Sequence, residues 1–154
     1  MTDEVSFIDT NLIVYAYDVG EPKKMNLALK LLTNIASGEM KACISNQILA
    51  EFFSVSTVKA KFPFTKQEAI QTIEELNSLK NLKKLVYSNE TVLSAAKTSM
   101  QHSVSIWDAL IAETMKENNV HTIYTENTKD FSKIPGINAV NPFKEKKFKK
   151  QGNQ

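Results

Sequence analysis

Three carboxylates stand inside apolar runs of this 154-residue sequence, where an unpaired charge is costly. Asp9 lies in FIDTNLIVYAY, Glu51 in ILAEFFSV and Asp108 in IWDALIA. All 19 basic residues are lysines, so no arginine is available as the usual buried partner. The partner is therefore a lysine or a metal ion. If the three side chains converge, oxygen-only ligands favour Mg²⁺ or Mn²⁺ over zinc.

Two further acids are candidates for a fourth metal ligand. Glu126 and Asp130 lie in the segment TENTKDF, which follows an expected strand. Four separate segments therefore each offer an acid, either at the end of an expected element or within an apolar stripe. A coincidence is harder to accept for all four segments than for any one of them.

Each acid also has a simpler structural explanation, which the sequence leaves open. Asp9 could cap a helix that begins immediately after it. Asp108 comes three residues after Ser105, so it could be the acid of a capping box. Glu51 could face water at a helix boundary, and acids are common in polar turns such as TENTKDF.

Other chemistries have weaker support. The histidines, His102 and His121, belong to no nucleophile-elbow pattern, and the four glycines form neither GxGxxG nor a P-loop. The single cysteine, Cys43, cannot form an internal disulfide, and the first twenty residues carry acids rather than a basic and then an apolar region. No stretch approaches the ~20 apolar residues of a membrane span. We therefore expect a cytoplasmic protein without a membrane role.

The lysines are unevenly distributed. Residues 144–154 (KEKKFKKQGNQ) hold five lysines and one glutamate, whereas the rest of the chain has 14 lysines against 16 acids. The body of the protein is therefore not the broad basic surface of a non-specific nucleic-acid binder. We expect one domain over residues 1–143 and a disordered, lysine-rich tail over residues 144–154.

Short apolar runs alternate with helical periodicity along this domain. The expected strands are Val5–Asp9, Ala42–Ser45, Lys84–Tyr87, His121–Thr125 and Ile137–Val140. The expected helices run from Pro22 to Ala36, over Asn46–Lys59, from Thr65 to Leu76, over Ser88–Gln101 and over Ser105–Asn118. The alternation predicts an α/β fold with a mostly parallel central sheet of about four or five short strands, flanked by helices. Function in such sheets is usually found at the carboxyl ends of the strands, where Asp9 and Glu126 lie.

The order and spacing of these motifs are similar to those of a known family. The motifs are FIDTN at residues 7–11, Glu51, WDALIA at 107–112, TENTKDF at 125–131 and VNPF at 140–143. Over residues 5–143 the chain resembles the PIN domains, and more narrowly the VapC-type toxins of prokaryotic toxin–antitoxin pairs.

The resemblance implies roles for particular residues. It makes Asp9, Glu51 and Asp108 the core acidic ligands of a metal site, with Thr10 and Asn11 supporting the first of them.

For the fourth position the resemblance favours Asp130 over Glu126. Many relatives have aspartate where this chain has Asn127, and others with asparagine there use the acid just before the phenylalanine. Asn127 would then assist as a neutral ligand or substrate contact, beside Thr125.

The activity implied by the resemblance is endonucleolytic cleavage of RNA with Mg²⁺ or Mn²⁺, in which metal-activated water hydrolyses the phosphodiester bond. The implied partner is a cognate antitoxin that inserts a segment into the active-site groove, and we expect a homodimer. Contacts to the RNA backbone would come from the tail and from a few lysines of the body. The candidates are Lys23, Lys24, Lys59 and Lys61.

Two alternatives come from other functional classes. A PIN-like module could bind RNA or protein without cutting it if Asn127 prevents metal loading. Asp9 could instead be a phosphorylated nucleophile, which is disfavoured because Asn11 replaces the second aspartate of the DxD motif that such enzymes need.

Overall fold

A five-stranded sheet runs through the centre of the structure, a computed structural model that describes residues 4–61 and 63–144. The strands are β1 (Ser6–Ile8), β2 (Ala42–Ser45), β3 (Leu82–Leu85), β4 (Thr122–Tyr124) and β5 (Asn138–Val140). They lie in the order β3-β2-β1-β4-β5, and every neighbouring pair is parallel. The predicted α/β class is confirmed, and the sheet is entirely parallel rather than mostly so.

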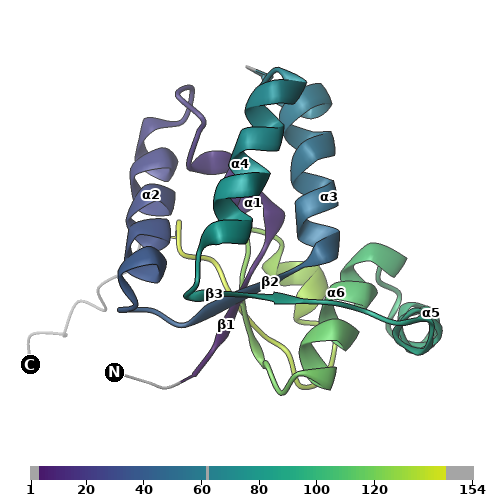
Figure 1. The fold of residues 1–154 in the computed structure, drawn as a ribbon. Helices are drawn as coiled ribbons and strands as arrows, with labels where there is room; N and C mark the ends of the chain where they lie inside the picture. Colours follow the sequence, from purple (N-terminus) through teal and green to yellow (C-terminus); the bar gives the residue numbers. More distant parts are fainter. Residues whose placement is uncertain (1–3, 62, 145–154) are drawn as a thin grey trace, which may run out of the picture.

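Helices connect the strands and cover the sheet. In the described ranges they are α1 (Thr10–Tyr15), α2 (Pro22–Ser37), α3 (Asn46–Ser54) followed by the π-helical turn η1 (Val55–Lys59), α4 (Lys66–Ser78), α5 (Asn89–His102), α6 (Ile106–Glu117) and α7 (Thr128–Phe131). In Figure 1, α2, α4 and α3 stand together above the sheet, while α5 and α6 lie beside each other to the right.

Local sequence signals fix several helix ends. Pro22 begins α2, and Gly38 ends it with φ at 82°, a left-handed conformation that glycine adopts without a steric penalty. The capping box predicted at the start of α4 is present. The Thr65 hydroxyl accepts from the Glu68 backbone N–H at 3.1 Å, and the Glu68 carboxylate accepts from the Thr65 N–H at 3.2 Å.

The predicted strand at Lys84–Tyr87 is wrong by two residues, because β3 spans Leu82–Leu85. Leu82 and Leu85 are buried and pair in register with Ala42 and Ser45 of β2, whereas Val86 is 71% exposed. Burial of the two leucines decides the register. The expected helix over Asn46–Lys59 also differs, since its last turn is the π-helical η1.

Strand order creates a switch point beside β1. The chain adds β2 and then β3 on one side of β1, and it returns to add β4 on the other side. Ligand sites in open parallel sheets lie at the carboxyl ends of the strands at such a point. Phe7 and Ile123, which pair across β1 and β4, are fully buried, so the core fixes the two strands that carry the site.

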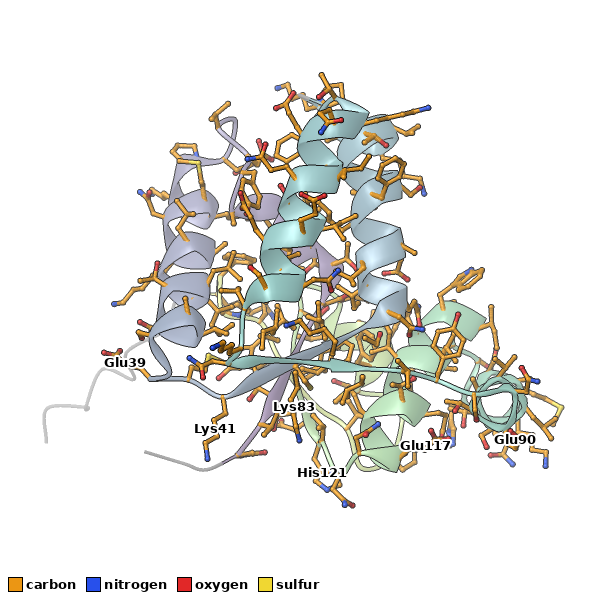
Figure 2. The ribbon with its side chains drawn as sticks, in the orientation of Figure 1. Glu39, Lys41, Lys83, Glu90, Glu117 and His121 are labelled. Atoms are coloured by element: carbon orange, nitrogen blue, oxygen red, sulfur yellow. The ribbon has the colours of Figure 1, made fainter. Side chains whose placement is uncertain are left out.

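The amino ends of the strands, opposite the site, carry other polar residues. Lys41 precedes β2 and His121 precedes β4, and Figure 2 shows both side chains pointing away from α2, α3 and α4. His121 therefore lies at the end of β4 remote from Asp9 and Thr125. None of the helices in the described ranges has the length and apolar character needed to cross a bilayer. The predicted disordered tail falls almost entirely outside the described residues.

Candidate active site

Asp9 follows β1 directly and is the N-cap residue of α1. It is 8% exposed, and its carboxylate accepts two hydrogen bonds, from the Thr10 backbone N–H at 2.7 Å and from the Thr125 hydroxyl at 2.6 Å. Burial raises the pKa of Asp9 to about 6. The two hydrogen bonds oppose this rise, and the negative charges of Glu51 and Asp108 add to it. Asp9 is thus both a helix cap and a member of a carboxylate cluster.

Glu51 lies on α3 and is tied to Asp9 through one intervening residue. The Thr10 hydroxyl donates to Glu51 Oε2 at 2.7 Å, and the Thr10 N–H donates to Asp9. The other oxygen, Oε1, accepts from the side-chain amide of Gln47 at 2.7 Å. Glu51 is half-buried and faces the site, so the alternative that it faces bulk water at a helix boundary does not describe this structure.

Asp108 lies in the first turn of α6. Ser105 caps this helix by accepting from the Asp108 backbone N–H at 3.1 Å, as the capping-box explanation requires for the serine. The Asp108 carboxylate also contacts Asn127, whose side-chain amide donates to Oδ2 at 3.1 Å. Burial raises the pKa of Asp108, and the negative charges of Asp130 and Glu51 raise it further.

Asp130 lies on the short helix α7, within electrostatic reach of Asp108. It also forms an exposed ion pair with Lys133, in which Nζ and Oδ1 are 3.3 Å apart. The structure therefore brings Asp130 to the edge of the cluster formed by Asp9, Glu51 and Asp108, which we call the carboxylate cluster.

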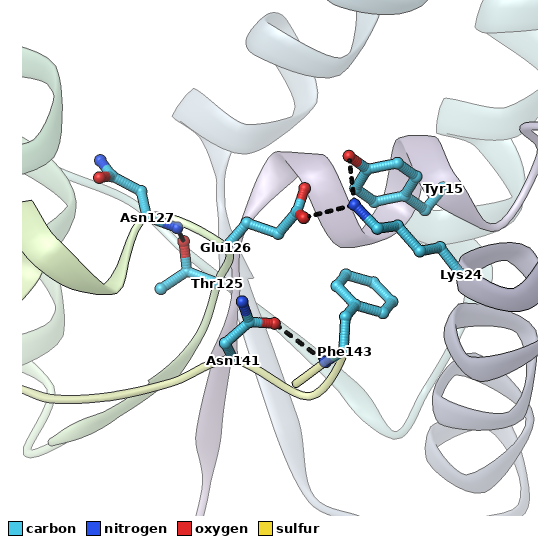
Figure 3. Close-up of polar contacts among 7 residues, drawn as sticks. All are labelled: Tyr15, Lys24, Thr125, Glu126, Asn127, Asn141 and Phe143. Atoms are coloured by element: carbon cyan, nitrogen blue, oxygen red, sulfur yellow. Dashed lines mark hydrogen bonds and ion pairs between the residues drawn. The ribbon is translucent and has the colours of Figure 1, made fainter. Parts of the chain in front are cut away.

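Glu126 has a different environment, shown in Figure 3. Its carboxylate accepts from Lys24 Nζ at 2.7 Å, and the same nitrogen lies 3.3 Å from the Tyr15 hydroxyl. Lys24 also lies over the rings of Tyr15 and Phe143, 4.7 and 5.7 Å from their centroids. The hydrogen bond to Glu126 raises the pKa of Lys24. The structure thus pairs Glu126 with a lysine from α2, and the Lys24 ammonium is held by contacts within the chain.

The predicted supporting residues surround the cluster. Thr125 Oγ1 donates to Asp9 and accepts from the Asn127 backbone N–H at 2.9 Å. Asn127 in turn donates from its side chain to Asp108, so one short segment after β4 contacts two of the three acids. Asn11 follows Thr10 on α1, and its buried carboxamide oxygen accepts no hydrogen bond from the described residues, so no contact links it to the acids.

Sequence reasoning missed Gln47. Its side-chain nitrogen donates to Glu51 Oε1 at 2.7 Å and to the backbone carbonyl of Trp107 at 3.0 Å, so it joins α3 to the first turn of α6, immediately before Asp108. Gln47 is 5% exposed. A signal was present, because Gln47 and Glu51 are four residues apart and share one face of a helix.

The carboxylate cluster is anionic and tightly hydrogen-bonded. None of the ion pairs between described residues includes Asp9, Glu51 or Asp108. In the described part of the chain, no three Asp, Glu, His or Cys side chains are grouped as a metal-binding set. Hydroxyl and amide donors instead hold the carboxylates. The carboxylate oxygens are ligands that suit Mg²⁺ or Mn²⁺, and binding of an ion would replace some of these hydrogen bonds.

The sequence matches the family model of the PIN domain over residues 6–137, which include every acid described above. The chain therefore belongs to the PIN domain family. A comparison with curated proteins gives no match.

Solved structures of similar fold include chains from toxin–antitoxin complexes. A chain of VapBC2 from Rickettsia felis, bound to a promoter DNA fragment, has a TM-score of 0.63 at 23% identity, covering 89% of this chain and 98% of that one. Mycobacterium tuberculosis VapC20, a toxin that cleaves the sarcin–ricin loop, has a TM-score of 0.66 at 15% identity and coverages of 84% and 94%. A chain of a toxin–antitoxin complex from Klebsiella pneumoniae has a TM-score of 0.62 at 18% identity, covering 91% of this chain and 99% of that one. At these identities the likeness establishes the fold.

Proposed function

We propose that this PIN domain is a Mg²⁺- or Mn²⁺-dependent endoribonuclease and the toxin of a toxin–antitoxin pair. The observation that carries the proposal is the convergence of Asp9, Glu51 and Asp108 at the switch point of the sheet. Glu51 and Asp108 both raise the pKa of Asp9, and no described lysine forms an ion pair with any of the three. Such a cluster attracts a divalent cation.

In this proposal Asp9, Glu51 and Asp108 hold the ion, and Asp130 contributes from the edge of the cluster. A divalent cation bound there supplies charge neutralisation at the phosphoryl oxygens and lowers the pKa of the attacking water. Hydrogen bonds from neighbouring residues orient acidic metal ligands and tune their affinity for the ion.

The neighbouring polar residues keep the acids in place. Thr125 and the backbone of Thr10 orient the Asp9 carboxylate, while the Thr10 hydroxyl and Gln47 orient Glu51. Asn127 restrains the Asp108 carboxylate.

The partners proposed are RNA as substrate and a cognate antitoxin as inhibitor. Three similar solved structures are complexes named as toxin–antitoxin or VapBC assemblies, which supports an antitoxin partner. We further propose a cytoplasmic homodimer, as expected from the sequence. Co-expression with the product of a short neighbouring reading frame, followed by size-exclusion chromatography with light scattering, tests both associations.

Chelation and analysis of the cleaved ends test the mechanism. Purified protein free of antitoxin should cut RNA with Mn²⁺ or Mg²⁺ and stop with EDTA. The products should carry a 5′-phosphate and a 3′-hydroxyl, because water rather than the ribose 2′-hydroxyl attacks phosphorus. Mass spectrometry that finds 2′,3′-cyclic phosphates, formed equally well in EDTA and by an Asp108→Asn variant, would move the chemistry to His102 or His121.

One observation favours a second candidate, a PIN module that binds without cutting. The carboxylates are held by hydrogen bonds rather than grouped as a metal-binding set, and Asn127 rather than an acid contacts Asp108. Isothermal titration with Mn²⁺ separates the two candidates, since only the nuclease should show binding that is lost in Asp9→Asn. Phosphoryl transfer to Asp9 has less support, because its buried carboxylate already accepts two hydrogen bonds.

A further inference from the structure

The single tryptophan of this chain, Trp107, stands directly before Asp108 in the first turn of α6. It is 60% exposed, whereas tryptophan side chains are usually largely buried. Every other aromatic side chain in residues 4–61 and 63–144 is buried or half-buried. The one exposed aromatic ring of the described chain therefore belongs to the residue next to an acid of the carboxylate cluster.

The backbone of Trp107 is fixed to this cluster. Its carbonyl oxygen accepts from Gln47 Nε2 at 3.0 Å, and the same nitrogen donates to Glu51 Oε1 at 2.7 Å. Residues 109–112, which follow Asp108, are buried and hold α6 in the core. Trp107 is therefore anchored to two of the three acids, to Asp108 by the peptide bond and to Glu51 through Gln47.

Helix geometry gives the side chains of Trp107 and Asp108 different directions. Successive residues of an α-helix are ~100° apart around its axis, so Asp108 joins the cluster while the Trp107 ring meets solvent beside it. The two Cα atoms are about 3.8 Å apart. A nucleotide whose phosphate lies at Asp108 therefore has its own base, or the base of its neighbour, within reach of the indole.

The charge near the cluster offers an RNA strand little ionic attraction. The cluster itself is acidic, and two lysines near it are already paired. Lys24 is paired with Glu126, and Lys133 with Asp130. Because the chain has no arginine, bidentate contacts to phosphate are absent as well. Stacking of a base on an aromatic ring supplies affinity that does not depend on these charges.

The surroundings of Trp107 suit a base better than an apolar protein surface. The exposed residues just before it, Ser103 and Ser105, are polar. Val104 and Ile106, which alternate with them, pack in or against the core. The centre of a protein interface is a contiguous apolar area, whereas a stacked base needs one aromatic face and has polar edges of its own.

We propose that Trp107 stacks on one base of the RNA substrate, in a nucleotide next to the scissile phosphodiester. The proposal rests on the ribonuclease function proposed above and adds to it a residue that holds the substrate. Trp107 supplies no ligand to the ion and takes no part in proton transfer. Its loss therefore weakens substrate binding and leaves the chemical step nearly unchanged.

The first test uses the fluorescence of Trp107, which is the only indole in the chain. A short single-stranded RNA is titrated into the full chain with Ca²⁺ in place of Mg²⁺, and gel electrophoresis of the same samples confirms that the RNA stays intact. EDTA replaces Ca²⁺ if the RNA is cut. Stacking should quench the emission and shield it from acrylamide. An abasic nucleotide at the stacked position should remove both effects, and abasic nucleotides elsewhere should not.

Variants then separate an aromatic face from apolar area, with affinity measured by the anisotropy of a labelled RNA. Trp107→Ala should weaken binding and raise KM roughly 5- to 100-fold, with kcat within a few-fold of wild type. Trp107→Phe keeps an aromatic face and should retain most of the affinity, whereas Trp107→Leu should not. Met100→Ala is the matched control, because it removes an apolar side chain that is 77% exposed near the end of α5. It should bind RNA as the wild type does.

Quenching that one abasic position abolishes, with tighter binding by Trp107→Phe than by Trp107→Leu, supports the proposal. RNA binding without a change in emission overturns it, as does no RNA binding in any of these conditions or equal affinity of wild type and Trp107→Ala. Emission that is shielded without RNA and becomes accessible on dilution also overturns it, and assigns Trp107 to a contact between two copies of this chain. Shielding by a co-expressed antitoxin and not by RNA assigns the ring to that protein instead.

Cleavage with Mn²⁺ is scored separately, so the two proposals can fail independently. Cleavage by Trp107→Ala with the wild-type KM upholds the nuclease and rejects the stacking contact. Quenching that depends on one nucleotide, in a protein that cuts no RNA with Mn²⁺, upholds the stacking contact and rejects the nuclease.

Discussion

Two acidic regions lie at the carboxyl ends of the strands and differ in how their negative charge is balanced. Glu126 follows β4 and is neutralised by Lys24 at 2.7 Å, with the rings of Tyr15 and Phe143 packed around the pair. In the carboxylate cluster, Asp9 and Asp108 both have raised pKa values and belong to none of the ion pairs between described residues.

The difference separates a structural acid from acids available for chemistry. A carboxylate with its own lysine gains nothing from a divalent cation and loses an ion pair on binding one. Carboxylates that repel one another gain stability when a cation arrives. The electrostatic environment, rather than the nearness of an acid to the end of a strand, therefore distinguishes Asp9 from Glu126.

The largest expected effect is on catalysis. Asp9→Asn, Glu51→Gln and Asp108→Asn should each reduce metal-dependent RNA cleavage by orders of magnitude, because each removes one charged oxygen ligand. Glu126→Gln is the matched control and should change the rate only a few-fold. Initial rates are measured for variants whose circular dichroism matches the wild type. If Glu126→Gln lowered the cleavage rate as much as Asp108→Asn does, the distinction between the two regions would be wrong.

Gln47→Leu should have an intermediate effect, roughly 10- to 100-fold in Mn²⁺ affinity or rate, as is usual for outer partners of metal ligands. The substitution removes the donor that holds Glu51 to the backbone of Trp107. Gln71→Leu, on the exposed surface of α4, is the control. Titration calorimetry measures the Mn²⁺ affinity of the wild type and both variants, and thermal denaturation measures their stability. A variant that loses thermal stability but keeps wild-type Mn²⁺ affinity would show that Gln47 only stabilises the fold.

The pH dependence of stability isolates the charge on Asp9. Its folded pKa of about 6 exceeds the ordinary 3.8, so between these values the folded state binds more protons than the unfolded state. The free energy of unfolding therefore falls as pH rises from 4 to 6, and the penalty of roughly 1–3 kcal/mol persists above pH 6. In urea denaturation without metal, the free energy of unfolding of Asp9→Asn should exceed that of the wild type by this amount at pH 7.5 but not at pH 4. An equal difference at both pH values would mean that Asp9 is not strained by burial and repulsion.

Much of the fold is encoded in local patterns. Apolar runs and capping residues indicated the five strands and the main helices, because burial and caps act over a few residues. The position of β3 was not determined locally, since Leu82 and Leu85 are selected by pairing with β2. The π-helical turn η1 likewise gave no distinct periodicity.

The acids of the site illustrate the same limit. Asp9, Glu51 and Asp108 were conspicuous because each interrupts an apolar run, and the structure brings all three together. Their catalytic role is still a prediction. The sequence could not separate Glu126 from Asp130 by environment, because the residue that neutralises Glu126 is Lys24, 102 positions away. Tertiary contacts of this kind leave no local signal.

The smallest expected effect concerns Lys24→Met, which removes the cation but keeps an apolar stem against Tyr15 and Phe143. The pair is partly exposed, with side chains 31% and 29% accessible, so the loss of unfolding free energy should be below about 1 kcal/mol. Cleavage by the variant should stay within a few-fold of wild type, since the carboxylate cluster is untouched. Urea denaturation at low and high salt checks the first expectation, because screening should weaken only the wild-type pair. A large fall in cleavage with an unchanged unfolding free energy would instead give Lys24 a role at the RNA, and Glu126 would then belong with the site rather than with the scaffold.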